Sequence, residues 1–170
     1  MITLRPLTPL LAAILLTPGA LGQSRIDLSG RWSVRLDPND EGVSAQWFAA
    51  PLAGGTSMKL PGTTDRAGLG EPETDPNPGF LSREHKFVGA AWYQRRLEIP
   101  EAWRKRPVEL HLERVLWESR VWVDGVAASS QDSLGTPHVH WLGRLSPGQH
   151  LLTLRIDNRM IHPIGNRSHC

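Results

Sequence analysis

The sequence predicts an all-β domain with the architecture of a β-sandwich. Apolar residues alternate with polar residues in several short runs, which is the pattern of half-buried strands. Turns rich in Gly, Pro, Asn and Asp separate these runs at about 8–12 residue spacing, as in sandwiches. No heptad, internal repeat or strand–helix alternation is present, and a chain of 170 residues has the length of one domain.

The first strands are predicted in the N-terminal half of the chain. Alternation over residues 30–36 places Trp32 and two aliphatic residues on one face. Residues 37–56 are predicted to form a loop with a short helical piece near 45–50. Met58 and Leu60 mark the next short strand, which a Pro-Gly turn ends.

The middle of the chain changes from irregular to regular structure. Residues 63–90 contain three prolines and several glycines, and a loop of that length inside a domain is usually functional or disordered. A strand is predicted over residues 92–99. Pro100 follows it and is expected at the first position of a single helical turn.

Three further strands are predicted in the C-terminal half, over residues 108–112, 117–123 and 151–156. Asp124 and Gly125 stand between two valines after the second of these strands. Both residue types tolerate a positive φ, so this dipeptide is a strong signal for a hairpin.

The first 22 residues are predicted to be a cleaved signal peptide. Arg5 supplies a positive charge, residues 7–16 are apolar, and Ala20-Leu21-Gly22 fits the cleavage site. The apolar run is shorter than the about 20 residues of a membrane span. We therefore expect a secreted or periplasmic protein with one sandwich domain over residues 23–170 and no membrane association after cleavage. A lipid-embedded anchor and an ordinary buried segment are the alternatives.

Charge and cysteine content exclude other classes of protein. The 19 basic and 17 acidic residues are scattered along the chain. Nucleic-acid binding needs a continuous basic stripe, so no nucleic-acid partner is expected. Cys170 is the single cysteine, which leaves no internal disulfide and makes the hydrophobic core the source of stability.

The aromatic residues are mainly tryptophans, with seven Trp against one Tyr and three Phe. Flat apolar rings suit stacking on other flat groups, but most of these residues fall in strand patterns beside aliphatic neighbours. Core packing is predicted for Trp32, Trp92 and Trp117. Trp122 shares its face with charged residues and is predicted to be exposed or to pack on a neighbouring domain, while Trp141 is left undecided.

Metal binding and cofactor binding find little support in the sequence. His138 and His140 are two residues apart, a common ligand spacing, but no third ligand follows at a fixed offset, so structural or surface histidines are predicted. Residues 37–42 resemble the start of a calcium loop, yet Phe48 stands where a bidentate Glu is needed. No phosphate-binding or dinucleotide fingerprint is present. We therefore assign no metal and no cofactor.

Acid–base catalysis by carboxylates needs a suitably placed pair of them. The candidates are Glu98, Glu109, Glu113 and Glu118, each on the polar face of an alternating strand. This position is typical of solvated surface charge. No catalytic residue is therefore assigned within the chain.

Four stretches resemble the N-terminal sugar-binding domain of glycoside hydrolase family 2, the β-galactosidase and β-glucuronidase group. They are residues 91–100, 108–125, 133–138 and 145–159. Their order and spacing are more specific than any one stretch, and the resemblance runs from about Ile26 to the end of the chain. It implies a jelly-roll β-sandwich related to galactose-binding domains.

The resemblance also implies a function. In family 2 the catalytic carboxylates lie on a later barrel domain, and loops of the sandwich form part of the wall of the sugar site. The chain is thus expected to bind a carbohydrate, a β-glycoside, to pack on the catalytic barrel of a parent enzyme, and to be inactive alone. It is interpreted as part of a longer or truncated glycosidase. A free-standing carbohydrate-binding module and a non-catalytic β-sandwich interaction domain remain alternatives.

Substrate-binding residues follow from the same resemblance, at the end of the last strand, on the loop leading out of it and in the long irregular loop. They are Asn77, Arg83, Asn158, Arg159, His162, Asn166 and His169.

Overall fold

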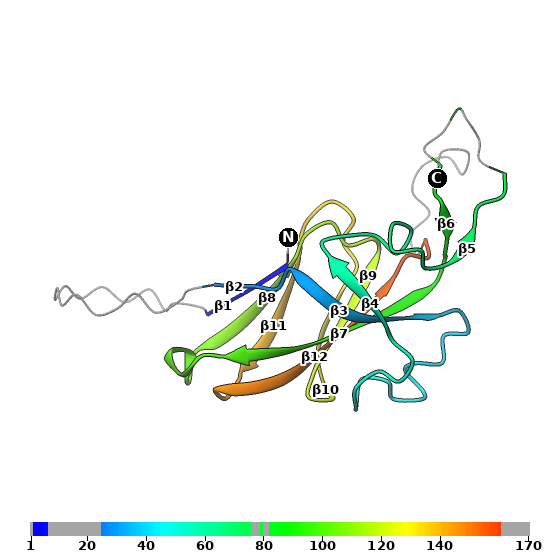
Figure 1. The fold of residues 1–170 in the computed structure, drawn as a ribbon. Coiled ribbons are helices and arrows are strands. Elements are labelled where there is room, and N and C mark those ends of the chain that lie inside the picture. The colour runs from blue at the N-terminus through cyan, green and yellow to red at the C-terminus, as the bar shows by residue number, and fades with distance from the viewer. Residues whose placement is uncertain (1, 7–24, 76–78, 80–81, 161–170) are drawn as a thin grey trace.

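The computed structural model describes residues 2–6, 25–75, 79 and 82–160. Two antiparallel sheets face each other, and a small hairpin projects from one end of the body (Figure 1). The six-stranded sheet has the order β10 (Val126–Gln131), β9 (Glu118–Val123), β12 (Gly148–Asp157), β7 (Ala90–Ile99), β3 (Gly30–Asp37) and β4 (Thr56–Leu60). The four-stranded sheet has the order β11 (His138–Arg144), β8 (Pro107–Leu112), β1 (Ile2–Pro6) and β2 (Ile26–Asp27). The hairpin pairs β5 (Glu71–Pro72) with β6 (His85–Lys86).

This architecture confirms the predicted all-β sandwich. The core lies between the two sheets, where the predicted inward residues of β3, β7, β8 and β12 meet. Its fully buried members include Leu4, Val34, Ile99, Leu110 and Leu152. The predicted hairpin is also confirmed, because Asp124 and Gly125 link β9 to β10 with φ of 50° and 80°. In the part of the chain that the structure describes, no helix is long and apolar enough to cross a membrane.

Some local predictions were wrong. Residues 42–48 form consecutive turns in place of the predicted helical piece. Pro100 precedes the short 3-10 turn η1 (Glu101–Trp103) as its N-cap and does not occupy its first position. The predicted leader is described only over β1, because residues 7–24 lie outside the described part of the chain.

The outer face of the six-stranded sheet is covered by the segment 39–53. Trp47, Phe48, Trp92 and Trp122, here called the aromatic cluster, pack beneath and within this segment. Phe48 stacks on Trp122 with ring centroids 5.1 Å apart, and Trp92 lies 5.2 Å from Trp122. Trp122 is therefore only 6% exposed, and the prediction that it is exposed was wrong. Trp32, Trp92 and Trp117 are buried as predicted.

The turn that resembled a calcium loop has a structural role. The Asp37 carboxylate accepts hydrogen bonds from the backbone N–H groups of Glu41 and Gly42, both at 2.8 Å, and from the Trp92 indole at 2.9 Å. Both carboxylate oxygens thus hold the start of the segment 39–53 against the sheet.

Gly42 is required by this close approach. A Cβ at this position would lie 2.4 Å from Trp92 Nε1, inside a contact that cannot open without moving the buried indole. We expect Gly42→Ala to lower the free energy of unfolding by about 1–3 kcal/mol through overpacking. Gly135→Ala is the matched control, because nothing lies within 4 Å of its added methyl. Urea unfolding of both variants checks this, and equal stabilities would contradict it.

Two buried histidines connect the two sheets. Ser119 of β9 lies 2.6 Å from His138 Nδ1 and 2.8 Å from His140 Nε2, both on β11. His138 Nε2 lies 2.7 Å from the Ser133 carbonyl, so that nitrogen donates and His138 Nδ1 accepts the Ser119 proton. His140 Nε2 must then donate to Ser119, and its Nδ1 accepts from Ser129 at 2.8 Å. Every ring nitrogen has a partner, which confirms the structural interpretation of these histidines.

This arrangement makes the stability depend on pH. Burial, together with the neighbouring His138, lowers the pKa of His140 to about 4, because the neutral ring is favoured in the folded state. The unfolded state therefore binds more protons as pH falls from the ordinary histidine value toward 4, and the fold loses stability over that range. The expected total loss is about 3 kcal/mol.

Urea unfolding at a series of pH values between 7 and 4 measures this loss. His140→Gln should flatten the profile, because no ionisable ring remains at that position. His111→Gln should keep the slope, since that ring lies on the outer face beside Glu109. A wild-type profile that is flat over this range would refute the expectation.

Candidate functional site

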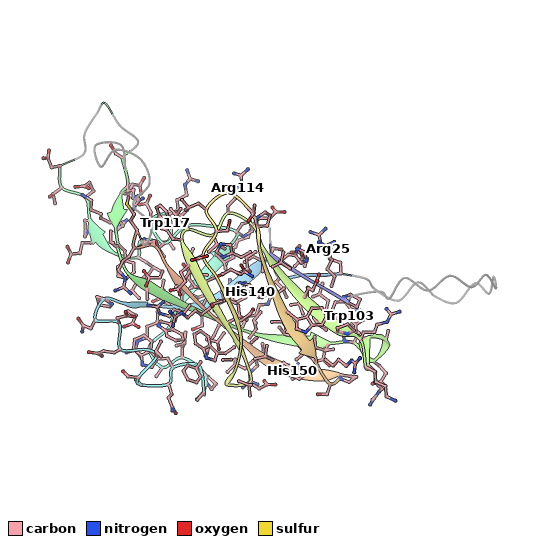
Figure 2. All side chains as sticks on the ribbon, turned by 180° about the vertical axis from the view of Figure 1, so that it is seen from behind. Arg25, Trp103, Arg114, Trp117, His140 and His150 are labelled. Atoms are coloured by element: carbon pink, nitrogen blue, oxygen red, sulfur yellow. The ribbon has the colours of Figure 1, made fainter. Side chains whose placement is uncertain are left out.

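A cavity of about 310 Å³ opens at one end of the sandwich. It lies where β4, β8 and β12 end and β7 begins, between the inner faces of the two sheets. Figure 2 shows Arg114, which lines the cavity, at this end, with Trp103 and His150 toward the opposite end. Because three strands end here, the loops that follow them converge around one opening.

The floor of the cavity is apolar and comes from both sheets. Tyr93, Leu154 and Ile156 line it from the six-stranded sheet, and Leu112 lines it from the four-stranded sheet. Burial raises the pKa of Tyr93 to about 12, because the phenolate would be poorly solvated there. The Tyr93 hydroxyl therefore remains protonated and can donate a hydrogen bond at any physiological pH.

The rim of the cavity is polar and comes from three separate segments. Its hydrogen-bonding side chains are Thr63, Thr64, Asp65, Arg83, His85, Glu113 and Arg114. An apolar floor with a few convergent polar groups is the usual composition of a small-molecule site. Such a site suits a polyol that has one apolar face and several hydroxyl groups.

Asp65 and His85 connect two of the rim segments. The Asp65 carboxylate accepts a hydrogen bond of 2.7 Å from the backbone N–H of His85, which ties the loop after β4 to β6. His85 Nδ1 is buried and has no hydrogen-bond partner among the described residues. A buried polar atom without a partner is costly, so this nitrogen favours a bound polar group or an ordered water.

Two of the predicted substrate-binding residues line this cavity. Arg83 is exposed at the rim. Asn158 also lines the cavity, but its side-chain amide donates to the Phe87 carbonyl at 2.8 Å and accepts from the Gly89 N–H at 2.7 Å. The Asn158 amide thus fixes the backbone of residues 87–89, which lead into β7. Asn158 shapes the cavity mainly in this way.

Arg159 lies in a different place. It donates to Asp157 at 2.9 Å and to Asp40 at 2.7 Å, inside a group of charges with Arg155 and Glu118 that we call the charge cluster. Arg159 does not line the cavity. The other predicted positions, Asn77, His162, Asn166 and His169, lie outside the described residues.

Most of the polar rim was not predicted from the sequence. Thr63, Thr64 and Asp65 follow β4 at the same end of the sandwich at which Asn158 follows β12, and Arg114 follows β8 there as well. The available signal was the position of each residue directly after a predicted strand. In antiparallel sheets, alternate strands end at the same edge, so these loops could have been grouped.

The electrostatics give no indication of a catalytic acid at the charge cluster. Hydrogen bonds from Arg159 and Arg155 lower the pKa of Asp40. Burial tends to raise the pKa of Asp157, but hydrogen bonds from Arg159 outweigh it and the net shift is downward. A glycosidic acid instead needs a raised pKa. In the described part of the chain, no group of three or more His, Cys, Asp or Glu residues is arranged for a metal ion.

Comparison with known proteins relates the chain to one enzyme group. The β-glucuronidase of Paenibacillus borealis is 25% identical over 134 residues, 78% of this chain and 21% of that protein. The β-glucuronidase of Pongo abelii is 31% identical over 114 residues, 61% of this chain and 16% of that protein. The expected resemblance to glycoside hydrolase family 2 is confirmed. No family model matches the chain.

Solved structures of the same group share the fold. The Ruminococcus gnavus β-glucuronidase in complex with D-glucuronic acid aligns with a TM-score of 0.62 at 22% identity, over 77% of this chain and 21% of that one. The chain therefore spans about a fifth of the length of the family 2 relatives that it matches. Over the matched length it is similar to the N-terminal domain of family 2 enzymes.

Proposed function

We propose that this chain is the sugar-binding domain of an exported family 2 glycosidase, with the end cavity contributing to the wall of a carbohydrate site. The observation that carries the proposal is the cavity itself, with an apolar floor of Tyr93, Leu112 and Ile156 beneath a polar rim. A pyranose ring can rest its C–H face on such a floor while its hydroxyl groups bond to the rim. The jelly-roll assignment and export through a cleaved leader belong to the same proposal.

The chemistry of bond cleavage is assigned to another domain. Hydrolysis of a glycosidic bond needs two carboxylates, one of which donates a proton. The sandwich would instead supply hydrogen bonds that position the sugar, which aid catalysis when they tighten in the transition state. We further propose that the catalytic barrel packs on the sandwich where Trp141 and Val139 of β11 are 52% and 39% exposed.

Binding of a monosaccharide tests the role of the cavity. D-Glucuronic acid is the first probe, because a relative is known in complex with it, and D-glucose is the uncharged comparison. With ¹⁵N-labelled protein, we expect millimolar binding that shifts the backbone amide signals of residues 63–65 and 113–116. Thr64→Val should weaken binding by about threefold to tenfold, since one neutral hydrogen bond contributes about 1 kcal/mol.

The matched control is Arg96→Ala, an exposed substitution on β7 away from the cavity lining. It should bind the sugar as the wild type does. Signals that shift only outside the cavity, or that do not shift at saturating sugar, would refute the role of the cavity. Cleavage of a chromogenic β-glucuronide by the purified chain alone would refute the division of labour between domains.

A further inference from the structure

β1 occupies a central position in the four-stranded sheet although it belongs to the predicted leader. It pairs with β8 from Ile2 opposite Leu112 to Pro6 opposite Val108. Its other edge pairs with β2, and the Ile2 carbonyl accepts a hydrogen bond of 3.0 Å from the Leu28 N–H. The space between β8 and β2 is called the β1 position below.

Cleavage after Gly22 would remove β1 and leave the β1 position open. Leu4 is fully buried, so its loss would leave an apolar hole between the sheets. β8 would lose its pairing partner along one edge, and unpaired backbone N–H and C=O groups inside a sheet are unfavourable. Ile2 also lines the end cavity, so the hole and the cavity would become continuous.

We propose that the β1 position is a strand-docking site, which in the exported protein takes an extended segment from the rest of the parent enzyme. This proposal rests on the proposed function, because it requires both export and a longer parent. Pairing of an added strand with an open sheet edge is a common mode of recognition, in which main-chain hydrogen bonds supply affinity.

β1 itself shows which chemistry fits. An apolar side chain is needed where Leu4 enters the core. A cation is favoured on the outer face, where Arg5 bonds to His111 at 3.2 Å and His111 in turn contacts Glu109. The position has neighbours on both sides, β8 and β2, so it accepts one strand and not the edge of another complete sheet. A single extended segment therefore fits better than a second copy of the domain.

A strand-exchange experiment tests the proposal. The full chain is produced with its own leader in a secreting host, and mass spectrometry of the exported protein identifies its first residue. The probe is a fluorescent peptide with the sequence of residues 2–6. We expect saturable binding to the exported protein and at least tenfold weaker binding of the same peptide carrying Leu4→Asp.

Two control proteins define the occupant. The unprocessed chain, made in the cytosol with β1 still attached, should not bind the peptide, because its position is filled. An exported protein extended by the residues that the downstream coding sequence encodes should also fail to bind the peptide. Its β8 amides should be protected from hydrogen exchange. Continued binding by this longer protein would overturn the assignment of the occupant.

Three other results would overturn the proposal. They are an exported protein that still begins at Met1, a folded exported protein that binds no peptide, and an exported dimer that the peptide does not dissociate. Loss of sugar binding with intact peptide binding would instead refute only the proposed function. The two failures are therefore distinguishable.

Discussion

Replacing Arg155 by methionine should lower the free energy of unfolding by about 3–5 kcal/mol. Arg155 is 4% exposed and bonds to Asp40 at 2.6 Å, to Asp157 at 2.8 Å and to Glu118 at 3.2 Å. Methionine keeps much of the side-chain volume but leaves the buried Asp157 carboxylate with less compensating charge. Removing one partner of a buried ion pair lowers the stability far more than replacing both partners by apolar residues does.

Arg120→Met is the control for this prediction. Arg120 bonds to the same Glu118 at 2.8 Å, but its side chain is 46% exposed. An exposed ion pair contributes about 0–1 kcal/mol, so this variant should be nearly as stable as the wild type. Chemical denaturation at neutral pH and low salt compares the three proteins. Similar stabilities for the two variants would show that the charge cluster is a solvated surface group.

Replacing Gln94 by methionine should cost about 4 kcal/mol, because several buried polar groups lose their partner at once. Gln94 is 3% exposed. Its oxygen accepts from the Leu52 N–H at 2.8 Å, and its nitrogen lies 3.0 Å from the Ala50 carbonyl and 2.9 Å from the Thr153 hydroxyl. One side chain on β7 thus fixes the end of the segment 39–53.

Gln149→Met removes a comparable amide from the surface, where Gln149 donates to Glu98 at 2.9 Å. Its effect should stay within about 0.5 kcal/mol. Hydrogen exchange separates two outcomes for the Gln94 variant. Loss of protection at Leu52 together with lower global stability is the expected result, while unchanged protection there would contradict the role of the Gln94 side chain as an anchor.

Much of the fold could be predicted because alternation is a local property. The inward residues of β3, β8 and β12 can be recognised from their neighbours in sequence alone. β11 was harder, since two of its buried positions are His138 and His140, which look polar until Ser119 and Ser133 supply their partners. The partners lie on other strands and loops, so no local pattern reveals them.

The segment 39–53 shows more clearly that local patterns do not reveal contacts between distant parts of the chain. Trp122 shares its strand face with charged residues, which predicts exposure, yet Phe48 stacks on it from a segment more than 70 residues earlier in the chain. Of the predicted substrate-binding residues, Arg83 and Asn158 line the cavity. The commitment of the Asn158 amide to Phe87 and Gly89 could not be predicted, because it depends on the path of a distant loop.

The aromatic cluster gives the domain a built-in spectroscopic reporter. Trp47 lies 5.9 Å from Trp92 at an interplanar angle of 60°, and Trp92 lies 5.2 Å from Trp122 at 31°. Indole transitions held so close and at fixed skewed angles couple as excitons and produce a paired circular dichroism band of opposite signs. That band should report the attachment of the segment 39–53 to the sheet, separately from the global β-sheet signal and without any label.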